Sequence, residues 1–117
     1  MKIDWKTGKT DFDYVTNNKG IYLICSKHSD NKVYVDYVGQ ASDLQKRLRE
    51  HWSQSETNLN LKNHIKNNGT SFSWYAEVSL QSDRDGIELY LYNYYKPSLN
   101  KNTPSANKEV ECNLPGK

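Results

Sequence analysis

The sequence predicts a small α+β domain in which a three-stranded antiparallel sheet is flanked by helices. Two apolar and β-branched segments, 20–26 and 33–39, are separated by turn residues, as in a hairpin. Two segments with helical spacing follow, then one that alternates apolar and polar residues, then a third helical segment. The order strand, strand, helix, helix, strand, helix is typical of a sheet covered by helices.

Length and composition favour a single domain without a membrane anchor. The chain has 117 residues, within the commonest domain size of roughly 100–150. Its net charge of +2 permits nucleic-acid binding but does not by itself indicate it. No apolar stretch approaches the roughly 20 residues of a transmembrane helix, and the first residues lack the apolar core of a signal peptide. We therefore expect a cytoplasmic protein with no membrane partner, in which Cys25 and Cys112 are free thiols.

The two ends of the chain differ from its body in composition. We predict one domain over residues 1–100, including a polar lead-in at 1–19 that packs loosely on the rest. Residues 101–117 are rich in Asn, Lys and Glu, which predicts a flexible tail without a functional site. The sequence has no internal repeat and no Cys/His spacing typical of a zinc site.

The first two strands bring two tyrosines to one face of the predicted hairpin. Residues 20–26 are apolar on both faces, which indicates a central strand. If the turn centres on Ser29 and Asp30, Tyr22 lies directly opposite Tyr37, and a two-residue slip keeps both on one face. Taken alone, this arrangement is explained by an ordinary cross-strand aromatic pair.

The first helix contains an arginine beside its apolar face. Ser42 and Gln45 form a predicted capping box. Arg47 then falls within the stripe formed by apolar residues and His51, where a charged group needs a partner or a role. The alternative is that its stem packs on the core while its head reaches water. Arg49 lies on the outer arc, as a solvated charge does.

Another helix and the last strand are predicted from weaker patterns. A helix is expected from about residue 58 to 68, with Leu61 and Ile65 inward and Gly69 just after its end. Apolar and aromatic residues alternate with polar ones over 72–80, which predicts a strand with one buried face.

The third helix places an acid next to its inward face. It is expected to begin near Ser82 or Asp83 and to end before Pro97, which cannot continue it. Glu88 borders the inward arc that Ile87 and Leu91 define. A plain surface carboxylate is the alternative interpretation of Glu88.

Taken together, these residues resemble a known pattern, that of the GIY-YIG nuclease family. Gly20-Ile21-Tyr22 matches the first triplet of the family name, and Tyr37-Val38-Gly39 is a variant of the second. Later positions also match: Arg47, His51, Glu88, and the segment Lys96-Pro97-Ser98-Leu99-Asn100. The resemblance covers about residues 14–101. Two departures are a longer loop between the triplets and the lack of a histidine near Thr57 and Asn58, which some members carry.

This resemblance implies a compact three-stranded α/β core and a metal-dependent nuclease. The implied catalytic residues are Tyr22, Tyr37, Arg47, His51 and Glu88. Glu88 is implied as the ligand of one Mg²⁺ or Mn²⁺ ion, which needs only one or two carboxylates. Tyr22 would orient or deprotonate the attacking water. To act as a phenolate, Tyr22 would need a lowered pKa. Gly39, Arg49 and Asn100 are expected near the substrate.

The expected substrate is nucleic acid, DNA in preference to RNA. A homodimer or a separate recognition partner stays open. The competing interpretation is a catalytically inactive nucleic-acid-binding module that acts within a larger assembly. The intact set of tyrosines, arginine and glutamate favours the enzyme.

Overall fold

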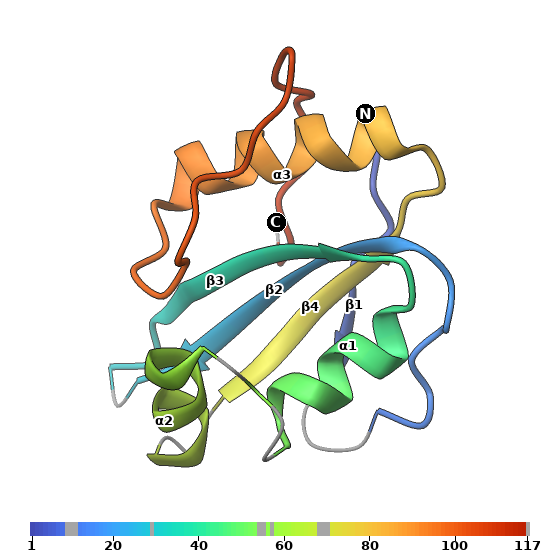
Figure 1. Ribbon diagram of the computed structural model, residues 1–117. Helices are drawn as coiled ribbons and strands as arrows, with labels where there is room; N and C mark the ends of the chain where they lie inside the picture. Colours follow the sequence, from blue (N-terminus) through green and yellow to red (C-terminus); the bar gives the residue numbers. More distant parts are fainter. Residues whose placement is uncertain (9–11, 29, 54–55, 57, 68–70, 117) are drawn as a thin grey trace.

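The computed structural model describes residues 1–8, 12–28, 30–53, 56, 58–67 and 71–116. These residues form a four-stranded antiparallel sheet with strand order β1-β4-β2-β3, and three helices. The elements are β1 Lys6–Gly8, β2 Gly20–Lys27, β3 Val33–Ala41, α1 Leu44–His51, α2 Leu59–Asn67, β4 Ser71–Glu77 and α3 Gln81–Tyr95. Helix α3 covers one face of the sheet, and α1 and α2 lie on the other (Figure 1). The predicted α+β class is confirmed, with one strand more than expected.

The additional strand comes from the lead-in and changes the environment of β4. Lys6 pairs with Tyr75, and Gly8 pairs with Ser73. Three mostly exposed residues carry no alternating pattern, so β1 could not be predicted. β1 makes β4 an interior strand. Because side chains pack on both faces of the sheet, Tyr75 and Ser73 are buried on one face of β4 and Ala76 on the other. The prediction that β4 has only one buried face was wrong.

The hairpin has a different register from the one predicted. Tyr22 lies opposite Gly39, and Tyr37 lies opposite Ile24, with an irregularity between Ile24 and Cys25. The irregularity and the turn that begins at His28 shift the pairing by two residues from the prediction. Because side chains alternate with a period of two, Tyr22 and Tyr37 still share one face.

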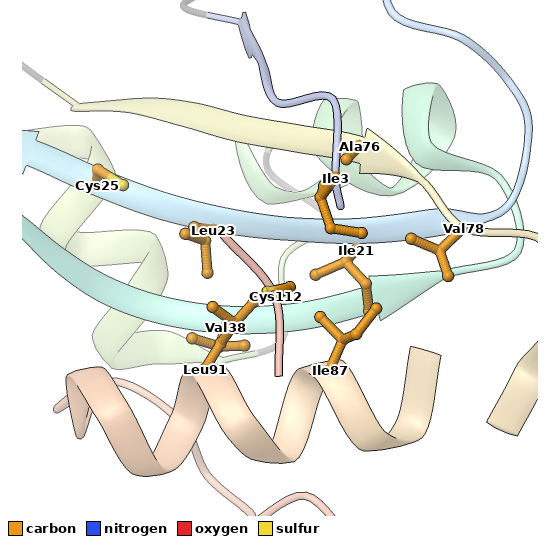
Figure 2. Packing of buried hydrophobic residues seen from close by; sticks show 10 residues of the cluster. All are labelled: Ile3, Ile21, Leu23, Cys25, Val38, Ala76, Val78, Ile87, Leu91 and Cys112. Atoms are coloured by element: carbon orange, nitrogen blue, oxygen red, sulfur yellow. The ribbon is translucent and has the colours of Figure 1, made fainter. Parts of the chain in front are cut away.

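The C-terminal segment packs against the body, which its polar composition did not predict. The Val110 N–H donates to the Gly86 carbonyl at 3.0 Å, and Asn113 exchanges two hydrogen bonds with the Ile3 backbone. Cys112 joins the apolar layer between the sheet and α3 (Figure 2). Both cysteines are buried free thiols.

The helix boundaries differ slightly from the predicted ones. Asp43, not Ser42, caps α1, because its carboxylate accepts the Lys46 N–H at 3.0 Å. The expected residue after α2, Gly69, lies outside the described residues. Helix α3 ends at Tyr95, and Lys96 takes the left-handed conformation just before Pro97. Within the described part of the chain, no helix is both long and apolar enough to cross a membrane.

Candidate active site

A groove of about 330 Å³ lies along the open edge of the sheet. Among the described residues no strand pairs with the outer side of its edge strand, β3, so side chains from helices on both faces can meet there. Tyr37 from β3, Arg47 from α1 and Glu88 from α3 all line this groove. Three residues that are far apart in the sequence are therefore brought to one place.

Tyr22 lies almost completely buried next to this groove. Only 1% of its surface is exposed, and its hydroxyl oxygen is 2.7 Å from Nε2 of His51. Its ring lies against Gly39, where a Cβ atom would come within 2.5 Å of the Tyr22 ring and hydroxyl. Tyr37 stacks on Tyr22 with ring centroids 6.1 Å apart, and His51 contacts both rings. The glycine at position 39 is thus needed to make room for Tyr22.

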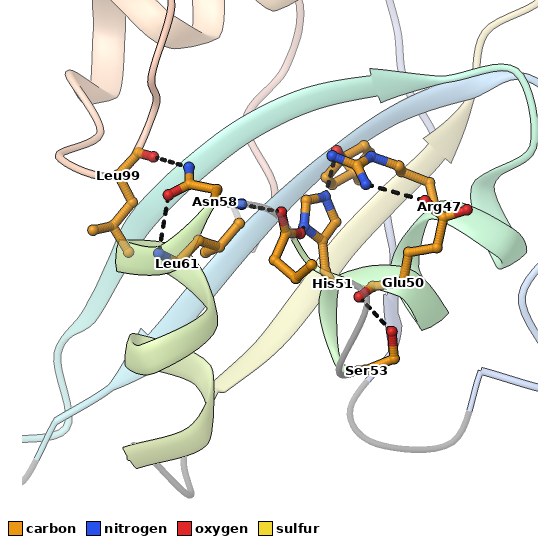
Figure 3. Close-up of polar contacts among 9 residues, drawn as sticks. Arg47, Glu50, His51, Ser53, Asn58, Leu61 and Leu99 are labelled. Carbon is orange, nitrogen blue, oxygen red and sulfur yellow. Dashed lines mark hydrogen bonds and ion pairs between the residues drawn. The ribbon is translucent and has the colours of Figure 1, made fainter.

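His51 is held from its other nitrogen by an acid that the sequence analysis did not single out. Nδ1 of His51 contacts the Glu56 carboxylate, and both side chains are buried. The second carboxylate oxygen of Glu56 accepts the Asn58 N–H at 2.8 Å. Asn58 in turn accepts the Leu61 N–H at the start of α2 and donates to the Leu99 carbonyl (Figure 3). Glu56 therefore fixes both the imidazole and the chain that enters α2.

Burial sets the protonation of both groups. It raises the pKa of Tyr22 well above 10, as does Tyr37, whereas the nearby Arg47 opposes this rise through its charge and a hydrogen bond. Burial, followed by the Arg47 charge, lowers the pKa of His51 to about 4, although Glu56 opposes this. A standing Tyr22 phenolate would need the opposite shift. At neutral pH the pair is therefore a neutral phenol beside a neutral imidazole.

Arg47 is half-buried between the apolar side of α1 and the groove. Its guanidinium pairs with Glu50 at 3.2 Å and lies close enough to Tyr22 to affect that residue's pKa. A planar guanidinium with several donors can bond these neighbours and still present N–H groups to an anion.

Glu88 stands on α3 one turn after Asp85. The Gln40 amide nitrogen of β3 donates to Glu88 at 3.1 Å and to Asp85 at 2.8 Å. Burial raises the pKa of Glu88; the Gln40 hydrogen bond opposes this rise, and the Asp85 charge adds to it. A nearby cation favours the ionised form of a carboxylate, so an ion bound at Glu88 would oppose this rise.

Asn100 pairs with the backbone of β3 at its outer edge. Its side-chain oxygen accepts the Val38 N–H at 3.0 Å, and its amide donates to the Val38 carbonyl at 2.8 Å. The preceding Leu99 N–H donates to the Asp36 carbonyl. One side chain therefore satisfies both backbone groups that a neighbouring strand would have paired.

A family model for the GIY-YIG catalytic domain matches residues 18–102. The chain belongs to the GIY-YIG family. Comparison with curated proteins and with solved structures gave no match. Membership implies a nuclease domain that acts on nucleic acid, and nucleases of this family generally use divalent metals.

Four predicted site residues of this GIY-YIG domain line the groove, namely Tyr37, Arg47, Glu88 and Asn100. Tyr22, Gly39 and His51 pack together next to it, but Arg49 lies apart. Its guanidinium pairs with Asp13, and 51% of the side chain is exposed. It is not among the residues that line the groove. The structure therefore gives no contact between Arg49 and the other predicted substrate-binding residues.

The donor set of the GIY-YIG site fits a hard divalent cation. Glu88 supplies a carboxylate at the groove, and the described residues contain no group of three or more His, Cys, Asp or Glu side chains that could enclose an ion. Mg²⁺ commonly binds through one or two carboxylates and completes its shell with water and substrate phosphates. Glu88 is the residue that would hold it, with Asp85 and Gln40 supporting the carboxylate.

Proposed function

We propose that this GIY-YIG domain is a divalent-metal-dependent endonuclease that hydrolyses phosphodiester bonds, with DNA as its substrate. The observation that carries the proposal is the convergence of Tyr37, Arg47 and Glu88 on one groove. Hydrolysis needs a cation at the phosphate, a charge donor for the transition state and a path for the proton of the attacking water. Glu88 and Arg47 supply the first two at this groove, and Tyr22 and His51, buried next to it, supply the third.

Arg47 is proposed to hold the scissile phosphate. Its planar fork can donate two parallel hydrogen bonds to phosphate oxygens. Its half-buried position strengthens the electrostatic attraction to the phosphate, compared with that of an exposed side chain. Lys101 also lines the groove and would add a contact with a neighbouring phosphate, which carries no sequence information.

Glu88 is proposed to hold the divalent ion, Mg²⁺ or Mn²⁺. When bound, such an ion supplies Lewis-acid stabilisation of the charge on the phosphoryl oxygens. Gln40 keeps the Glu88 carboxylate in place through its amide. Asn100 is proposed to keep β3, and therefore Tyr37, in position through its two bonds to Val38.

Tyr22 and His51 are proposed to carry the proton. The raised pKa of Tyr22 disfavours a phenolate in the resting protein, so the phenol must lose its proton as it gains one from the water. The His51 Nε2 atom lies 2.7 Å from the phenol oxygen, and its lowered pKa leaves it neutral and able to accept. Tyr37, stacked on Tyr22, is proposed to position the phosphate.

The test is cleavage of supercoiled plasmid, followed as nicked and linear products, with Mg²⁺, with Mn²⁺ and with EDTA. We expect cleavage with either metal and none with EDTA. Glu88→Gln should abolish cleavage but keep the fold and DNA binding, because a glutamine can still accept the Gln40 hydrogen bond. Glu111→Gln, a matched change of an exposed acid, should cleave like the unaltered protein.

The same assay separates the alternatives. Full activity of Glu88→Gln would remove this residue as the metal ligand. Binding of DNA without cleavage under any metal condition would favour the inactive binding module. Cleavage of duplex or single-stranded RNA in place of the plasmid would replace DNA as the substrate.

A further inference from the structure

A buried acid in a loop is unusual enough to need an explanation. Glu56 is 4% exposed, and acids are almost never fully buried unless they are paired. One of its carboxylate oxygens accepts the backbone N–H of Asn58, and the other contacts Nδ1 of His51. An acid can accept a hydrogen bond from a nearby backbone N–H while it stays exposed to water. The contact with Asn58 therefore does not explain why Glu56 is buried against His51.

The contacts of His51 define a line of three side chains from three segments. Tyr22 on β2 lies at Nε2, His51 is on α1, and Glu56 lies at Nδ1 in the loop before α2. Nδ1 and Nε2 of a neutral imidazole cannot both carry the proton: one donates and the other accepts. A carboxylate can only accept from an imidazole N–H, so it selects the form with the proton on Nδ1. Nε2 is then an acceptor that faces the Tyr22 hydroxyl.

We propose that Glu56 is a positioning residue that fixes His51 with its proton on Nδ1, so that Nε2 can accept the proton of Tyr22 during cleavage. This inference rests on the proposed nuclease function. It adds a residue outside the set Tyr22, Tyr37, Arg47, His51, Glu88 and Asn100. The logic is that of an acid that orients and stabilises a catalytic histidine, with a phenol in the place of the serine.

The proton balance of the step is complete with the groups present. The water oxygen forms a bond to phosphorus while it gives one proton to the Tyr22 oxygen, and its other proton stays on the new phosphate hydroxyl. The Tyr22 proton moves to Nε2 of His51, and the bond between phosphorus and the leaving ester oxygen breaks. The leaving oxygen takes a proton from solvent, and the imidazolium later returns one to solvent.

Glu56 also stabilises the imidazolium that this step forms. Among the described residues, the charged and titratable groups that face His51 are Tyr22 from β2, Tyr37 from β3, Arg47 from α1 and Glu56. Arg47 disfavours a positive charge on the ring, whereas Glu56 favours it. Without the charge of Glu56, as in Glu56→Gln, the transient imidazolium would face the unfavourable positive charge of Arg47 with no acid to offset it.

The first measurement is the tautomer of His51 in the unaltered protein, from two-bond ¹H–¹⁵N correlation spectra at neutral pH. The chain has three histidines, so His28→Gln and His64→Gln variants assign the remaining signals. We expect the neutral form with the proton on Nδ1. A neutral His51 with its proton on Nε2, or a protonated ring, would overturn the proposal without reference to any activity.

The second measurement is the single-turnover cleavage rate of Glu56→Gln against Glu111→Gln. A glutamine can present its NH₂ to Nδ1 and so stabilise the wrong tautomer. We expect the form with the proton on Nε2 to appear and the rate to fall at least tenfold, up to the roughly 10²–10⁴ of a lost general base. A lost rate with the tautomer unchanged would assign Glu56 a structural role, as would an unchanged rate.

The two proposals can fail separately. If the unaltered protein cuts nucleic acid but Glu56→Gln cuts equally well, the nuclease function stands and this inference is wrong. If the unaltered protein cuts nothing, the nuclease function fails, while the tautomer measurement still decides whether Glu56 orients His51. Because that measurement uses the unaltered protein, it does not depend on whether Glu56→Gln folds.

Discussion

Gly39→Ala is the substitution that most directly tests the packing behind the groove. A Cβ atom at this position would lie 2.5 Å from both Cζ and the hydroxyl oxygen of Tyr22. Ordinary van der Waals contact begins at 3.4 Å, so the ring or the strand must move by about 1 Å, the size of displacement that can cost 10²-fold in rate. Tyr22 is buried on every side, and its hydroxyl is held at 2.7 Å from His51. The movement therefore breaks or lengthens that hydrogen bond.

The expected loss has two parts that can be measured separately. Overpacking of a dense core costs typically 1–3 kcal/mol, which for a domain of this size lowers the melting temperature by roughly 4 °C per kcal/mol. The displacement of Tyr22 should lower the single-turnover cleavage rate on the order of 10²-fold. Since domains have about 5–15 kcal/mol of stability, the variant should still fold at 25 °C.

The matched control is Gly8→Ala. There a Cβ atom would meet Ser73 Oγ at 3.1 Å and Phe12 at 3.4 Å, so a small adjustment suffices, and β1 lies at the far edge of the sheet from β3. We expect wild-type cleavage from this variant. If Gly39→Ala keeps its melting temperature and rate but binds DNA more weakly, Gly39 serves close approach of the substrate and the packing argument is wrong.

Three further predictions follow from the same geometry. Tyr22→Phe should lower the single-turnover rate by roughly 10²–10⁴ with little change in melting temperature, and Tyr37→Phe should lower it less; equal wild-type rates would make both tyrosines structural. Arg47→Ala should lower the rate by about 10²–10³, whereas Arg49→Ala, which loses only an exposed pair with a neighbouring acid, should retain it; the reverse order would mean that the phase of α1 is misassigned. The free energy of unfolding should fall as the pH drops from 6.5 to about 4, because burial lowers the pKa of His51 in the folded protein and the unfolded chain therefore binds the proton first. The loss approaches about 3 kcal/mol. In urea unfolding, His51→Gln should show a correspondingly weaker pH dependence.

The parts of the fold that could be predicted are those with a repeated pattern. The apolar run at 20–26 and the helical spacing of Leu44, Arg47 and Leu48 are signals that extend over several residues, and the helix and strand they predicted are present. Helical phase also placed Arg47 beside the apolar stripe, where the structure has it half-buried. Short or irregular features lack such redundancy. The three residues of β1 and the irregularity after Ile24 were missed for this reason.

The site was predictable only as far as its residues lie on regular elements or match the family triplets. Glu56 lies between two helices, in a loop without periodicity, and its burial arises from contacts with His51 and Asn58. One local signal existed, because Asn58 two residues later is a good helix cap, which marks the residues just before it as the entry to a helix. Arg49 shows the converse. Its charge near a matched motif suggested that it binds the substrate, whereas its side chain lies on the outer side of α1 and pairs with Asp13.

The position of β3 at the edge of the sheet explains why one site can use both layers of the fold. An interior strand would separate Arg47 on α1 from Glu88 on α3 by a continuous sheet, but at an edge both helices can reach the same groove. An open edge carries unpaired N–H and C=O groups that invite pairing with another chain. Asn100 satisfies both groups of Val38 with a side chain, which is short and leaves the neighbouring edge accessible. A strand in its place would cover the groove, so Asn100 protects the edge and keeps it open.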